Sequence, residues 1–531
     1  MNPKRYALIS VYDKTGIIDL ARAILKKGYE ILSTGGTLKY LTENGIKAVD
    51  ISEYTGFPEM MNGRVKTLNP KIYGGILAVR SDKKHMEELK KHGFGLIDIV
   101  VCNLYPFEET LEKEDATEEE LIEKIDIGGV TLIRAAAKNY KDVLVFISPD
   151  DYGLINSDIS LEMRRKLARK AFTRTYQYDE AIEHWFREIL NEPELLDLHY
   201  EKVMSLRYGE NPHQKAAFFR NPLNTDSNVT NAKILQGKQM SFNNYVDADS
   251  ALELVKEFER PTCAIIKHNN PCGVASADTI EEAFEFAFDV DSLSAFGGVV
   301  ALNRTCTKNI AQYLIDKKIF FEIIVCPNFE KEALEILKKK ENLRLLETGS
   351  LKIDKARRDI KKIAGGILIQ TKDTYQITTK DLKVVTRARP TDEQIRAMIF
   401  ATKVVKHVMS NAVVFAKLVP SKKASNSREN KQDSGPVEVT TGIGSGQTSR
   451  VDAVVIAAYK AKDRHGEDFI KGSVMSSDAF FPFPDAAIAA IKAGASALIQ
   501  PGGSIKDAEV IKAVDELGVP MVFTGKRFFR H

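Results

Sequence analysis

The chain has 531 residues, which is too long for one hydrophobic core, so about two to four domains are expected. Apolar residues make up 44% of it and charged residues 28%, as in folded globular proteins. The 76 basic and 73 acidic residues nearly cancel to a net charge of +3, which argues against a nucleic-acid-binding protein because such proteins usually carry a basic stripe.

The five cysteines are odd in number and show no CxxC spacing, which argues against a disulfide framework and against a four-cysteine zinc site. The N-terminal segment 1–16 lacks the apolar stretch of a secretory signal, and no run of about 18 apolar residues predicts a membrane span. We therefore expect a soluble, reduced, cytoplasmic protein without a metal, a nucleic-acid partner or a membrane partner.

The first part of the chain alternates predicted strands and helices. Strands are predicted at 6–12, 30–34, 74–79, 97–105 and 143–148. Helices are predicted between them, including 17–28, 83–92 and 129–139. Such alternation is typical of a parallel sheet with helices on both faces, in which ligands bind beyond the carboxyl ends of the strands.

A long helix is predicted over about 160–190, followed by a linker at 191–200. The elements predicted after the linker are a buried strand at 361–370, a helix at 392–409, a strand at 410–417, a helix at 485–493, a strand at 495–501, a helix at 505–517 and a strand at 519–525. The polar stretch 421–436 is interpreted as an exposed insertion. This second part has room for two α/β lobes.

Two motifs in the first part each follow a predicted strand and open a helix. They are SVYDKTG (10–16) and STGGT (33–37). Helix N-termini offer free N–H groups and a positive dipole end, which suit phosphate. Either motif alone is equally compatible with a simple helix cap. Two of them after successive strands favour a phosphate site.

Three further motifs add cations, a tyrosine and an aspartate to the ends of the same elements. They are RVKTLNP (64–70), CNLYPF (102–107) and IDIGGVTLIRAAAKN (125–139). Taken singly, each has a plain structural explanation, such as basic residues that satisfy the dipole at a helix C-terminus. Together they predict one anion-lined pocket in which a Lys, a Tyr and an Asp transfer protons.

The most informative pair of the second part is Lys267-His268, at the end of the apolar run in AIIKHNNPCG (264–273). We expect the strand to stop there and a loop to begin. An imidazole titrates near neutral pH, and the neighbouring ammonium keeps it neutral or binds an anionic or carbonyl group. For an isolated pair, a solvated surface role is the better explanation. The surrounding motifs reverse that preference.

Those motifs supply an arginine, flexible glycines and an aromatic wall. They are SLRYGENPHQ (205–214), SAFGG (294–298), IGSGQTSR (443–450) and SSDAFFPFPD (476–485). Arginine suits phosphate or carboxylate, and phenylalanines beside an aspartate suit a planar heterocycle. The same phenylalanines are equally expected in a hydrophobic core.

In this order, the motifs closely resemble the bifunctional purine-biosynthesis family that joins AICAR (phosphoribosylaminoimidazolecarboxamide) formyltransferase to IMP cyclohydrolase. The resemblance runs from Val11 to the C-terminus. It implies an α/β protein with a methylglyoxal-synthase-like parallel-sheet domain over 1–196. It also implies two cytidine-deaminase-like lobes without zinc, over 201–380 and 381–531.

The resemblance further implies the reactions and partners. A formyl group passes from 10-formyltetrahydrofolate, a co-substrate, to the 5-amino group of AICAR, and formyl-AICAR then closes to IMP with loss of water. No tightly bound cofactor and no metal are expected. A homodimer is expected, with the transformylase sites at the subunit interface.

Site residues follow from the same resemblance, motif by motif. The implied catalytic residues are Lys66, Tyr105, Asp126 and Lys138 for ring closure, and Lys267 and His268 for formyl transfer. The implied nucleotide ligands of the first site are Ser10, Tyr12, Asp13, Lys14, Thr34, Gly35, Gly36, Thr37, Arg64, Thr67, Cys102 and Asn103. The implied AICAR ligands of the second are Arg207, Tyr208, Gly297, Glu322, Asn411 and Arg450, and the folate ligands are Val451, Phe480, Asp485, Ser504 and Arg527.

Two other functions are alternatives. A zinc-dependent nucleoside deaminase carries H-x-E and a later P-C-x-x-C, but only Pro271-Cys272 matches that signature here. The second is a non-catalytic, nucleotide-sensing role for the N-terminal domain. Arg64, Lys66 and Lys138 argue against it, because a sensor needs phosphate ligands but not a Tyr and Asp proton set.

Overall fold

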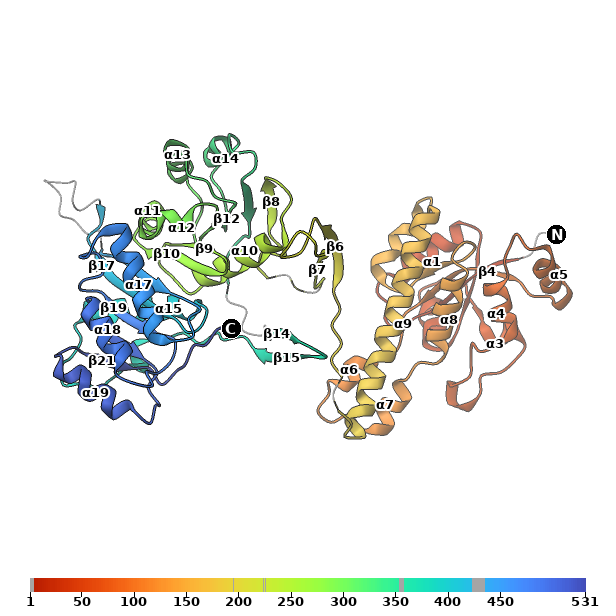
Figure 1. Cartoon of the computed structure of the whole chain (residues 1–531). Coiled ribbons are helices and arrows are strands. Elements are labelled where there is room, and N and C mark those ends of the chain that lie inside the picture. Colours follow the sequence, from red (N-terminus) through yellow and green to blue (C-terminus); the bar gives the residue numbers. More distant parts are fainter. Residues whose placement is uncertain (1–3, 194, 223, 225, 353–357, 423–434) are drawn as a thin grey trace. The chain divides into compact units, whose positions relative to one another are not determined.

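The computed structural model describes residues 4–193, 195–222, 224, 226–352, 358–422 and 435–531. The chain divides into two compact units, Met1–Leu198 (unit 1) and His199–His531 (unit 2), whose elements are labelled in Figure 1. Among the helices of the described residues, none is both long and apolar enough to span a bilayer.

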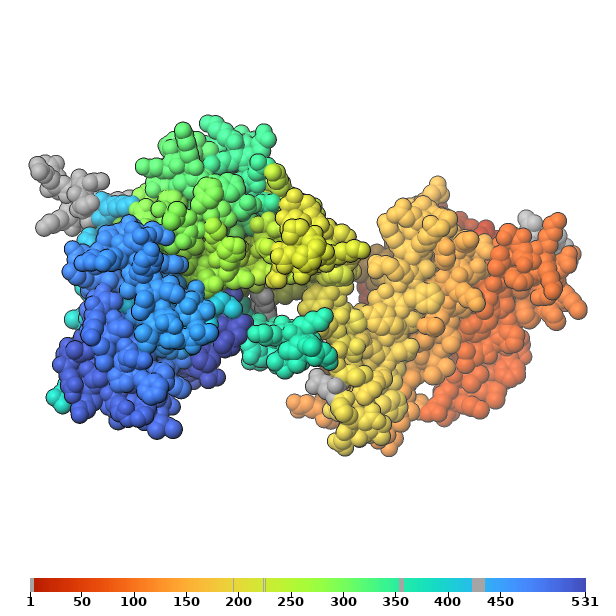
Figure 2. Space-filling view, in the orientation of Figure 1, coloured from red at the N-terminus to blue at the C-terminus, as the bar shows by residue number. Residues whose placement is uncertain are grey.

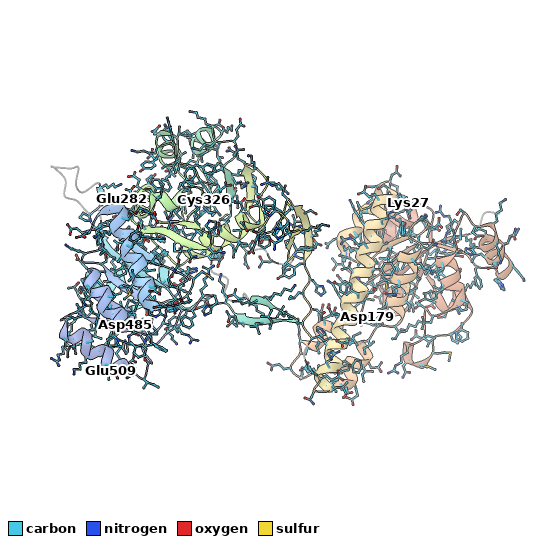
Figure 3. All side chains as sticks on the ribbon, viewed as in Figure 1. Lys27, Asp179, Glu282, Cys326, Asp485 and Glu509 are labelled. Atoms are coloured by element: carbon cyan, nitrogen blue, oxygen red, sulfur yellow. The ribbon has the colours of Figure 1, made fainter. Side chains whose placement is uncertain are left out.

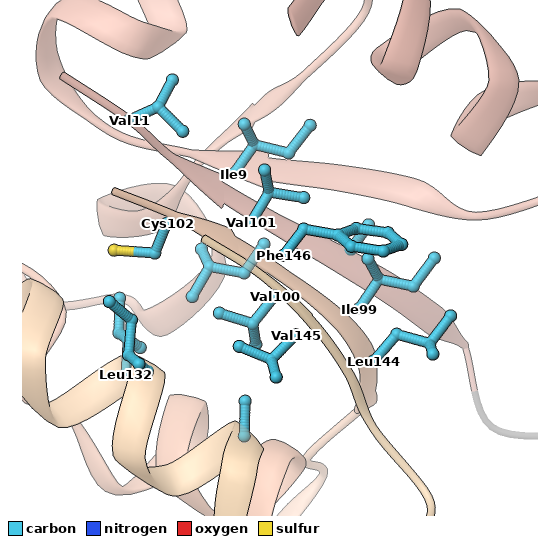
Figure 4. Close-up of a cluster of buried hydrophobic side chains, with 14 of the residues drawn as sticks. Ile9, Val11, Ile99, Val100, Val101, Cys102, Leu132, Leu144, Val145 and Phe146 are labelled. Atoms are coloured by element: carbon cyan, nitrogen blue, oxygen red, sulfur yellow. The ribbon is translucent and has the colours of Figure 1, made fainter. Parts of the chain in front are cut away.

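Unit 1 is built on a parallel sheet. Its five strands in the described part of the chain are β1 (Arg5–Ser10), β2 (Glu30–Ser33), β3 (Val49–Asp50), β4 (Leu96–Cys102) and β5 (Leu144–Phe146), in the order β3-β2-β1-β4-β5. Every residue of β4 is buried, as expected for a central parallel strand covered on both faces. Figure 4 shows its side chains packed with those of β1 and β5 and with Leu132. The predicted parallel α/β sheet is confirmed.

Helices cover both faces of this sheet. They are α1 (Ile17–Lys26), α2 (Gly35–Glu43), α3 (Ile51–Thr55), η1 (Met61–Gly63), α4 (Pro70–Leu77), α5 (Lys83–His92), α6 (Phe107–Leu111), α7 (Glu118–Lys124), α8 (Gly128–Lys138), η2 (Pro149–Asn156) and α9 (Leu161–Ile189). The predicted long helix is α9. It starts where the Ser160 side chain accepts a hydrogen bond from the Met163 N–H, and it buries Tyr178 and Trp185 in the core.

The strand predicted at 74–79 is wrong, because most of that segment belongs to α4. The Asn69 side chain accepts from the Lys71 N–H at 2.9 Å, and Pro70 occupies the first turn, so both favour a helix start. A short apolar run such as GGIL does not distinguish strand from buried helix. The short β3 takes the edge position of the sheet instead.

Unit 2 holds one large mixed sheet. Its twelve strands in the described residues are β8 (Lys233–Gln236), β9 (Thr262–Lys267), β10 (Asn270–Ser276), β11 (Val299–Leu302), β12 (Ile323–Cys326), β13 (Arg344–Glu347), β16 (Lys383–Val384), β17 (Val413–Val419), β18 (Val437–Gly444), β19 (Val474–Ser477), β20 (Ala497–Gln500) and β21 (Met521–Phe523). The order across the sheet is β16-β21-β20-β19-β17-β18-β10-β9-β11-β12-β13-β8.

This sheet contains the same motif twice. In lobe 1 (β8–β13) an antiparallel pair, β9 and β10, is followed by three parallel strands and an antiparallel edge strand. Lobe 2 (β16–β21) repeats this arrangement with β17 and β18. Local hydrogen bonds recur too: Gly349 N–H donates to Pro327 O at 3.0 Å, and Gly525 N–H donates to Pro501 O at 3.0 Å. The two lobes meet where β10 pairs antiparallel with β18.

The helices of unit 2 lie on both faces of the sheet. They are α10 (Phe242–Val255), α11 (Ile280–Val290), α12 (Ser292–Ala295), α13 (Lys308–Asp316), α14 (Lys331–Leu337), η3 (Thr379–Asp381), α15 (Asp392–Val405), α17 (Arg450–His465), α18 (Asp485–Ala493) and α19 (Asp507–Glu516). Equivalent helices α10 and α15 share one core that runs across both lobes. On the other face each lobe has its own core, under α11, α13 and α14 or under α17, α18 and α19.

Two hairpins stand outside the large sheet: β6 (Glu201–Leu206) with β7 (Ala216–Arg220), and β14 (Arg358–Ile363) with β15 (Gly366–Thr371). The second corrects the buried strand predicted at 361–370. The chain turns at Gly365, where φ is +77°, and the aliphatic residues on both sides are exposed, teal in Figure 2. A continuous apolar run was interpreted as core, although its paired glycines signal a turn.

The later elements follow the prediction closely. The helix predicted at 392–409 ends earlier, at Val405, and the strand predicted at 410–417 lies at Val413–Val419. The predicted helices and strands from 485 to 525 are α18, β20, α19 and β21. Most of the predicted insertion, 423–434, lies outside the described residues.

Candidate active sites

Unit 1 has a cavity of about 660 Å³ beyond the carboxyl ends of β1, β2 and β4. The predicted residues that line it are Ser10, Tyr12, Lys14, Thr34, Gly35, Gly36, Thr37, Arg64, Lys66, Thr67, Cys102, Asn103, Tyr105 and Asp126. Five motifs that are far apart in the sequence are thus brought to one place: three of them follow β1, β2 and β4, and the other two lead into α4 and α8.

A helix N-terminus faces this cavity. Helix α2 begins at Gly35, and no side chain caps it, so its first N–H groups are free for an anion. The Lys66 Nζ lies only 3.4 Å from the place where a Cβ on Gly35 would stand. An ammonium group and a helix dipole therefore act on the same point, which suits a phosphate.

Asp126 is the buried carboxylate of the cavity wall. It accepts hydrogen bonds from the Gly129 N–H at 2.7 Å and the Tyr105 N–H at 3.3 Å. Burial raises its pKa above the usual range for an aspartate, although these two bonds act in the opposite direction. A Cβ on Gly129 would lie 2.5 Å from the carboxylate, so glycine is required there. A fixed carboxyl with a raised pKa is suited to proton transfer.

Two carboxylates that the sequence did not single out pair with the predicted cations. Lys66 Nζ lies 3.2 Å from the Glu59 carboxylate, and Arg64 forms an ion pair with Glu123. Both pairs are partly exposed, so each contributes little to stability. An anionic ligand has to compete with them for its cations.

Some predicted nucleotide ligands instead hold the loop after β1. Asn103 accepts from the Tyr12 and Asp13 N–H groups at 2.5 and 3.0 Å and donates to the Asp13 carbonyl at 2.9 Å. The Thr37 hydroxyl donates to the carbonyl of Val11 at 2.9 Å. Polar side chains at strand ends thus shape the cavity as well as line it.

Two predicted residues lie elsewhere in this unit. Asp13 lines a neighbouring cavity of about 350 Å³. Lys138 is the last residue of α8 and lines a cavity of about 640 Å³ with Arg134, Arg165 and Phe172, whereas the first residue of α8, Gly128, lines the cavity of Asp126. Within one chain, the structure does not bring Lys138 to Asp126.

In unit 2 most of the predicted residues lie on one side of the large sheet, where strands end or begin. Strands β9, β18, β19, β20 and β21 point toward this side, and β11, β12 and β17 run away from it. This side of the sheet is here called the site edge. The predicted residues that lie at or just beyond the strand ends there are Lys267, His268, Gly297, Glu322, Asn411, Arg450, Val451, Phe480, Asp485, Ser504 and Arg527. Figure 3 labels Asp485, the first residue of α18.

Lys267 and His268 do not open a loop, as was expected, but form a tight hairpin. Lys267 pairs with Asn270, and between them His268 and Asn269 have φ values of 53° and 61°, the geometry of a two-residue turn. The Asp247 carboxylate, which sequence reasoning missed, accepts from both turn N–H groups, at 3.4 and 2.8 Å. The exposed His268 side chain thus projects from a fixed backbone.

The Lys267 ammonium reaches the segment that leads into the neighbouring strand, β11. Its Nζ donates to the Phe296 carbonyl at 2.8 Å. The next residue, Gly297, has φ +73° and donates its N–H to Phe320 O at 2.9 Å. Glu322 follows two residues after Phe320 and pairs with the buried Arg344. Lys267, Gly297 and Glu322 are therefore neighbours.

Arg450 is buried and engaged within the protein. It forms an ion pair with the buried Asp478, and it donates to the Ser477 hydroxyl and to Asn411 Oδ1, both at 2.8 Å. The Asn411 amide also donates to Gln447 O at 2.9 Å. This geometry favours a role of Arg450 in holding Asn411 over direct binding of phosphate.

In the aromatic segment after β19, one phenylalanine belongs to the hydrophobic core and two are accessible to a ligand. Phe481 is fully buried in the core, whereas Phe480 is 37% and Phe483 is 56% exposed. The Asp478 carboxylate is buried against Arg450, so it is withdrawn from any ligand. Phe480 is thus partly exposed and lies three residues after the end of β19, so it is the aromatic side chain of this segment best placed to contact a ligand.

Arg207 and Tyr208 follow β6, and the Arg207 guanidinium lies 5.6 Å from the Tyr208 ring centroid. Bonds from Gln239 to Ser205 O and from Asn243 to Glu210 O, each 3.3 Å, tie this segment to the start of α10. No group of three His, Cys, Asp or Glu side chains suited to a metal occurs within the described ranges.

The chain is similar to known proteins over nearly its whole length. An AICARFT/IMPCHase bienzyme model matches residues 136–460, and an MGS-like domain model matches 16–131. Proteins named "Bifunctional purine biosynthesis protein PurH" from Caldicellulosiruptor bescii and Acetivibrio thermocellus are 47% identical, and one from Thermoanaerobacter sp. is 48% identical. In each case 99% of both chains is covered.

These matches confirm the resemblance found in the sequence and give no support to a zinc deaminase. The chain therefore belongs to the AICARFT/IMPCHase bienzyme family, the bifunctional enzymes of purine biosynthesis that join AICAR formyltransferase to IMP cyclohydrolase.

Proposed function

We propose that the two reactions are divided between the two units: formyl transfer at the site edge of unit 2 and ring closure in the Asp126 cavity of unit 1. The observation that carries this division is that each unit has its own set of proton-transfer and anion-binding groups. His268 and Lys267 stand in one, and Asp126, Tyr105 and Lys66 in the other.

For formyl transfer, the 5-amino nitrogen of AICAR attacks the formyl carbon of 10-formyltetrahydrofolate. His268 accepts the amine proton, and the carbon–nitrogen bond to the folate breaks with protonation of the departing nitrogen. The Lys267 hydrogen bond goes to a neutral carbonyl oxygen, so its charge is available to stabilise the developing oxyanion. The fixed hairpin turn supports this role because it limits where both side chains can point.

For ring closure, the carboxamide nitrogen of formyl-AICAR attacks the formyl carbon, and water leaves. Asp126 moves the proton, since burial raises the pKa of its carboxyl above the usual range for an aspartate and so makes the carboxylate a stronger base. Tyr105 and Lys66 stabilise the oxyanion. The phosphate binds at the N-terminus of α2, beside Lys66 and with Lys14 and Arg64 on the same cavity.

Lys138 keeps its predicted catalytic role only as a hypothesis, because it lines another cavity of the chain. If the hypothesis holds, Lys138→Ala abolishes ring closure of supplied formyl-AICAR and spares formyl transfer. Unchanged ring closure in a folded variant would remove Lys138 from the catalytic set.

We also propose a homodimer that covers the β14–β15 hairpin. Exposed aliphatic side chains gather on it: Ile360, Ile363, Ile367, Leu368 and Ile369. An exposed apolar patch on a free hairpin is typical of an interface. Sedimentation of Leu368→Asp should show monomers where the unchanged chain shows dimers, and if dimers persist, the interface lies elsewhere.

The domain limits 1–196, 201–380 and 381–531 and a cytoplasmic location complete the proposal. The repeated order of strands supports the limit between the two lobes.

The test of the divided function is to assay the two reactions separately on full-length variants. His268→Ala should lose formyl transfer and keep ring closure, and Asp126→Asn should do the reverse. If either folded variant lost both activities, the division would be wrong.

A further inference from the structure

We propose that Arg530, the penultimate residue, is a positioning residue for formyl transfer. It links the His268 turn of lobe 1 to the Asn411–Arg450 pair of lobe 2. The inference rests on the proposed place of formyl transfer at the site edge. The hydrogen bonds of Arg530 go to Ser410, Ser250 and His407, so its action is through the groups it holds.

On the side of lobe 2, the backbone of Arg530 pairs with Ser410 in both directions. The Arg530 N–H donates to the Ser410 hydroxyl at 3.1 Å, and the Ser410 N–H donates to the Arg530 carbonyl at 2.9 Å. The same hydroxyl donates to the Asp478 carboxylate at 2.5 Å. Asp478 pairs with Arg450, which in turn holds Asn411. Four contacts therefore lead from Arg530 to Asn411, by way of Ser410, Asp478 and Arg450.

On the side of lobe 1, the guanidinium acts through one serine. Arg530 Nη2 donates to the Ser250 hydroxyl at 2.9 Å, and that hydroxyl donates to Asn269 Oδ1 at 3.1 Å. Asn269 is the second residue of the turn that carries His268. The rotation of the Asn269 side chain is thus set from one side by Ser250, while Asp247 holds its N–H from the other.

The guanidinium is also tied to the segment that follows α15. Its Nη1 donates to the His407 carbonyl at 2.9 Å, while Nη2 serves Ser250. A planar fork with two nitrogens can serve two acceptors on different lobes at once. A lysine in this place keeps the charge but has one nitrogen, so it can satisfy one acceptor well and the other poorly.

A second link runs parallel to this one. The Met409 N–H donates to Asn270 Oδ1 at 3.0 Å, and Asn270 Nδ2 donates to the His268 carbonyl at 3.1 Å. The turn is therefore held against lobe 2 from both of its ends. Loss of Arg530 should loosen the turn without detaching it, which predicts a slower reaction in a folded protein.

The experiment compares Arg530→Met, Arg530→Lys and Arg260→Met in the full-length chain. Arg260 is the matched control, because it also joins the lobes, through Asp278, Glu438 and Pro436 O, but at the sheet edge opposite the site. We expect Arg530→Met to lower kcat for formyl transfer about 10- to 100-fold, because a small misplacement of a reacting group has such an effect. The KM for AICAR should change much less, and Arg530→Lys should recover only part of kcat.

Two internal controls separate positioning from instability. Ring closure of supplied formyl-AICAR should stay unchanged in Arg530→Met, and Arg260→Met should leave kcat for formyl transfer unchanged. A double variant with Ser250→Ala should be no slower than Arg530→Met alone, because both changes break the same link.

Three results would overturn the inference: an unchanged kcat in folded Arg530→Met, a change in KM alone, or an equal loss of kcat in Arg260→Met. The wider proposal fails in a different way. If His268→Ala retained formyl transfer, the site itself would be misplaced, whereas an inactive His268→Ala beside an unchanged Arg530→Met rejects the role of Arg530 only.

Discussion

The two sites of this chain are built by different means. The cavity of unit 1 gathers the loops that follow neighbouring parallel strands, and each loop brings a short run of functional residues. The site edge of unit 2 takes its residues from two lobes of equal topology, joined through β10 and β18. The first is a property of one sheet, and the second depends on contacts between lobes.

The difference also shows in the charges. In unit 1 the cations Arg64 and Lys66 are partly exposed and paired with partly exposed carboxylates. In unit 2 Arg450 is buried in a network with Asp478. Ligands of the first site thus meet accessible charges. In the second site, the charged side chains of Arg450 and Asp478 hold the geometry of the site itself.

The largest effect expected from this comparison concerns His268. His268→Ala should lower formyl transfer by about 10³- to 10⁴-fold, since it removes the proposed base. Ring closure of supplied formyl-AICAR should stay at its normal rate. The measurement is a pair of steady-state assays on one preparation, and the idea is lost if the two rates fall together.

The next effect concerns the buried pair that joins Arg450 to Asp478. Arg450→Met leaves a carboxylate buried and unpaired, which should lower the free energy of unfolding by about 3–5 kcal/mol. The double variant Arg450→Met with Asp478→Asn should recover part of that loss. Urea unfolding measures both. Equal destabilisation by both variants would show that the pair is not what stabilises lobe 2.

In unit 1, Asp126→Asn should lower ring closure by about 10²-fold or more, because an amide cannot transfer the proton. In the unchanged enzyme, Asp126 must be ionised to act as base. Its raised pKa therefore places the acid limb of the ring-closure pH profile above the pH of an ordinary aspartate. An acid limb at the usual aspartate pKa, or one that survives in Asp126→Asn, would contradict this assignment.

The smallest effect tests the accessible charges. Glu59→Gln removes the carboxylate that competes with phosphate for Lys66, so the KM for formyl-AICAR should fall about two- to fivefold, the range of an exposed ion pair. The effect should shrink at high salt. Glu53→Gln, an exposed change in nearby α3, is the control and should leave KM unaltered.

The sequence allowed more of unit 1 to be predicted than of unit 2. Three motifs begin where a predicted strand ends, so the position of each motif relative to its strand already implied a shared cavity. They are SVYDKTG, STGGT and CNLYPF. Helix α4 was not predicted, because its short apolar run suits a strand equally well. Asn69 and Pro70 signal a helix start, but the prediction did not use them.

In unit 2 the residues of the site edge were found by motif, but the groups that hold them were not. Asp247, Ser250 and Arg530 act through hydrogen bonds to residues distant in the sequence, and nothing in their local sequence reports those partners. The β14–β15 hairpin was not predicted for a related reason. An apolar run in the sequence does not show whether its side chains are buried in a core or exposed on a surface.

The most direct test of the divided function mixes two full-length variants, each of which lacks one of the two activities. His268→Ala and Asp126→Asn, each unable to convert AICAR to IMP alone, are combined and supplied with AICAR and 10-formyltetrahydrofolate. Formation of IMP in the mixture, through formyl-AICAR made by one protein and closed by the other, is the result expected. A mixture of folded variants that makes formyl-AICAR and no IMP, or neither product, would contradict two separate sites.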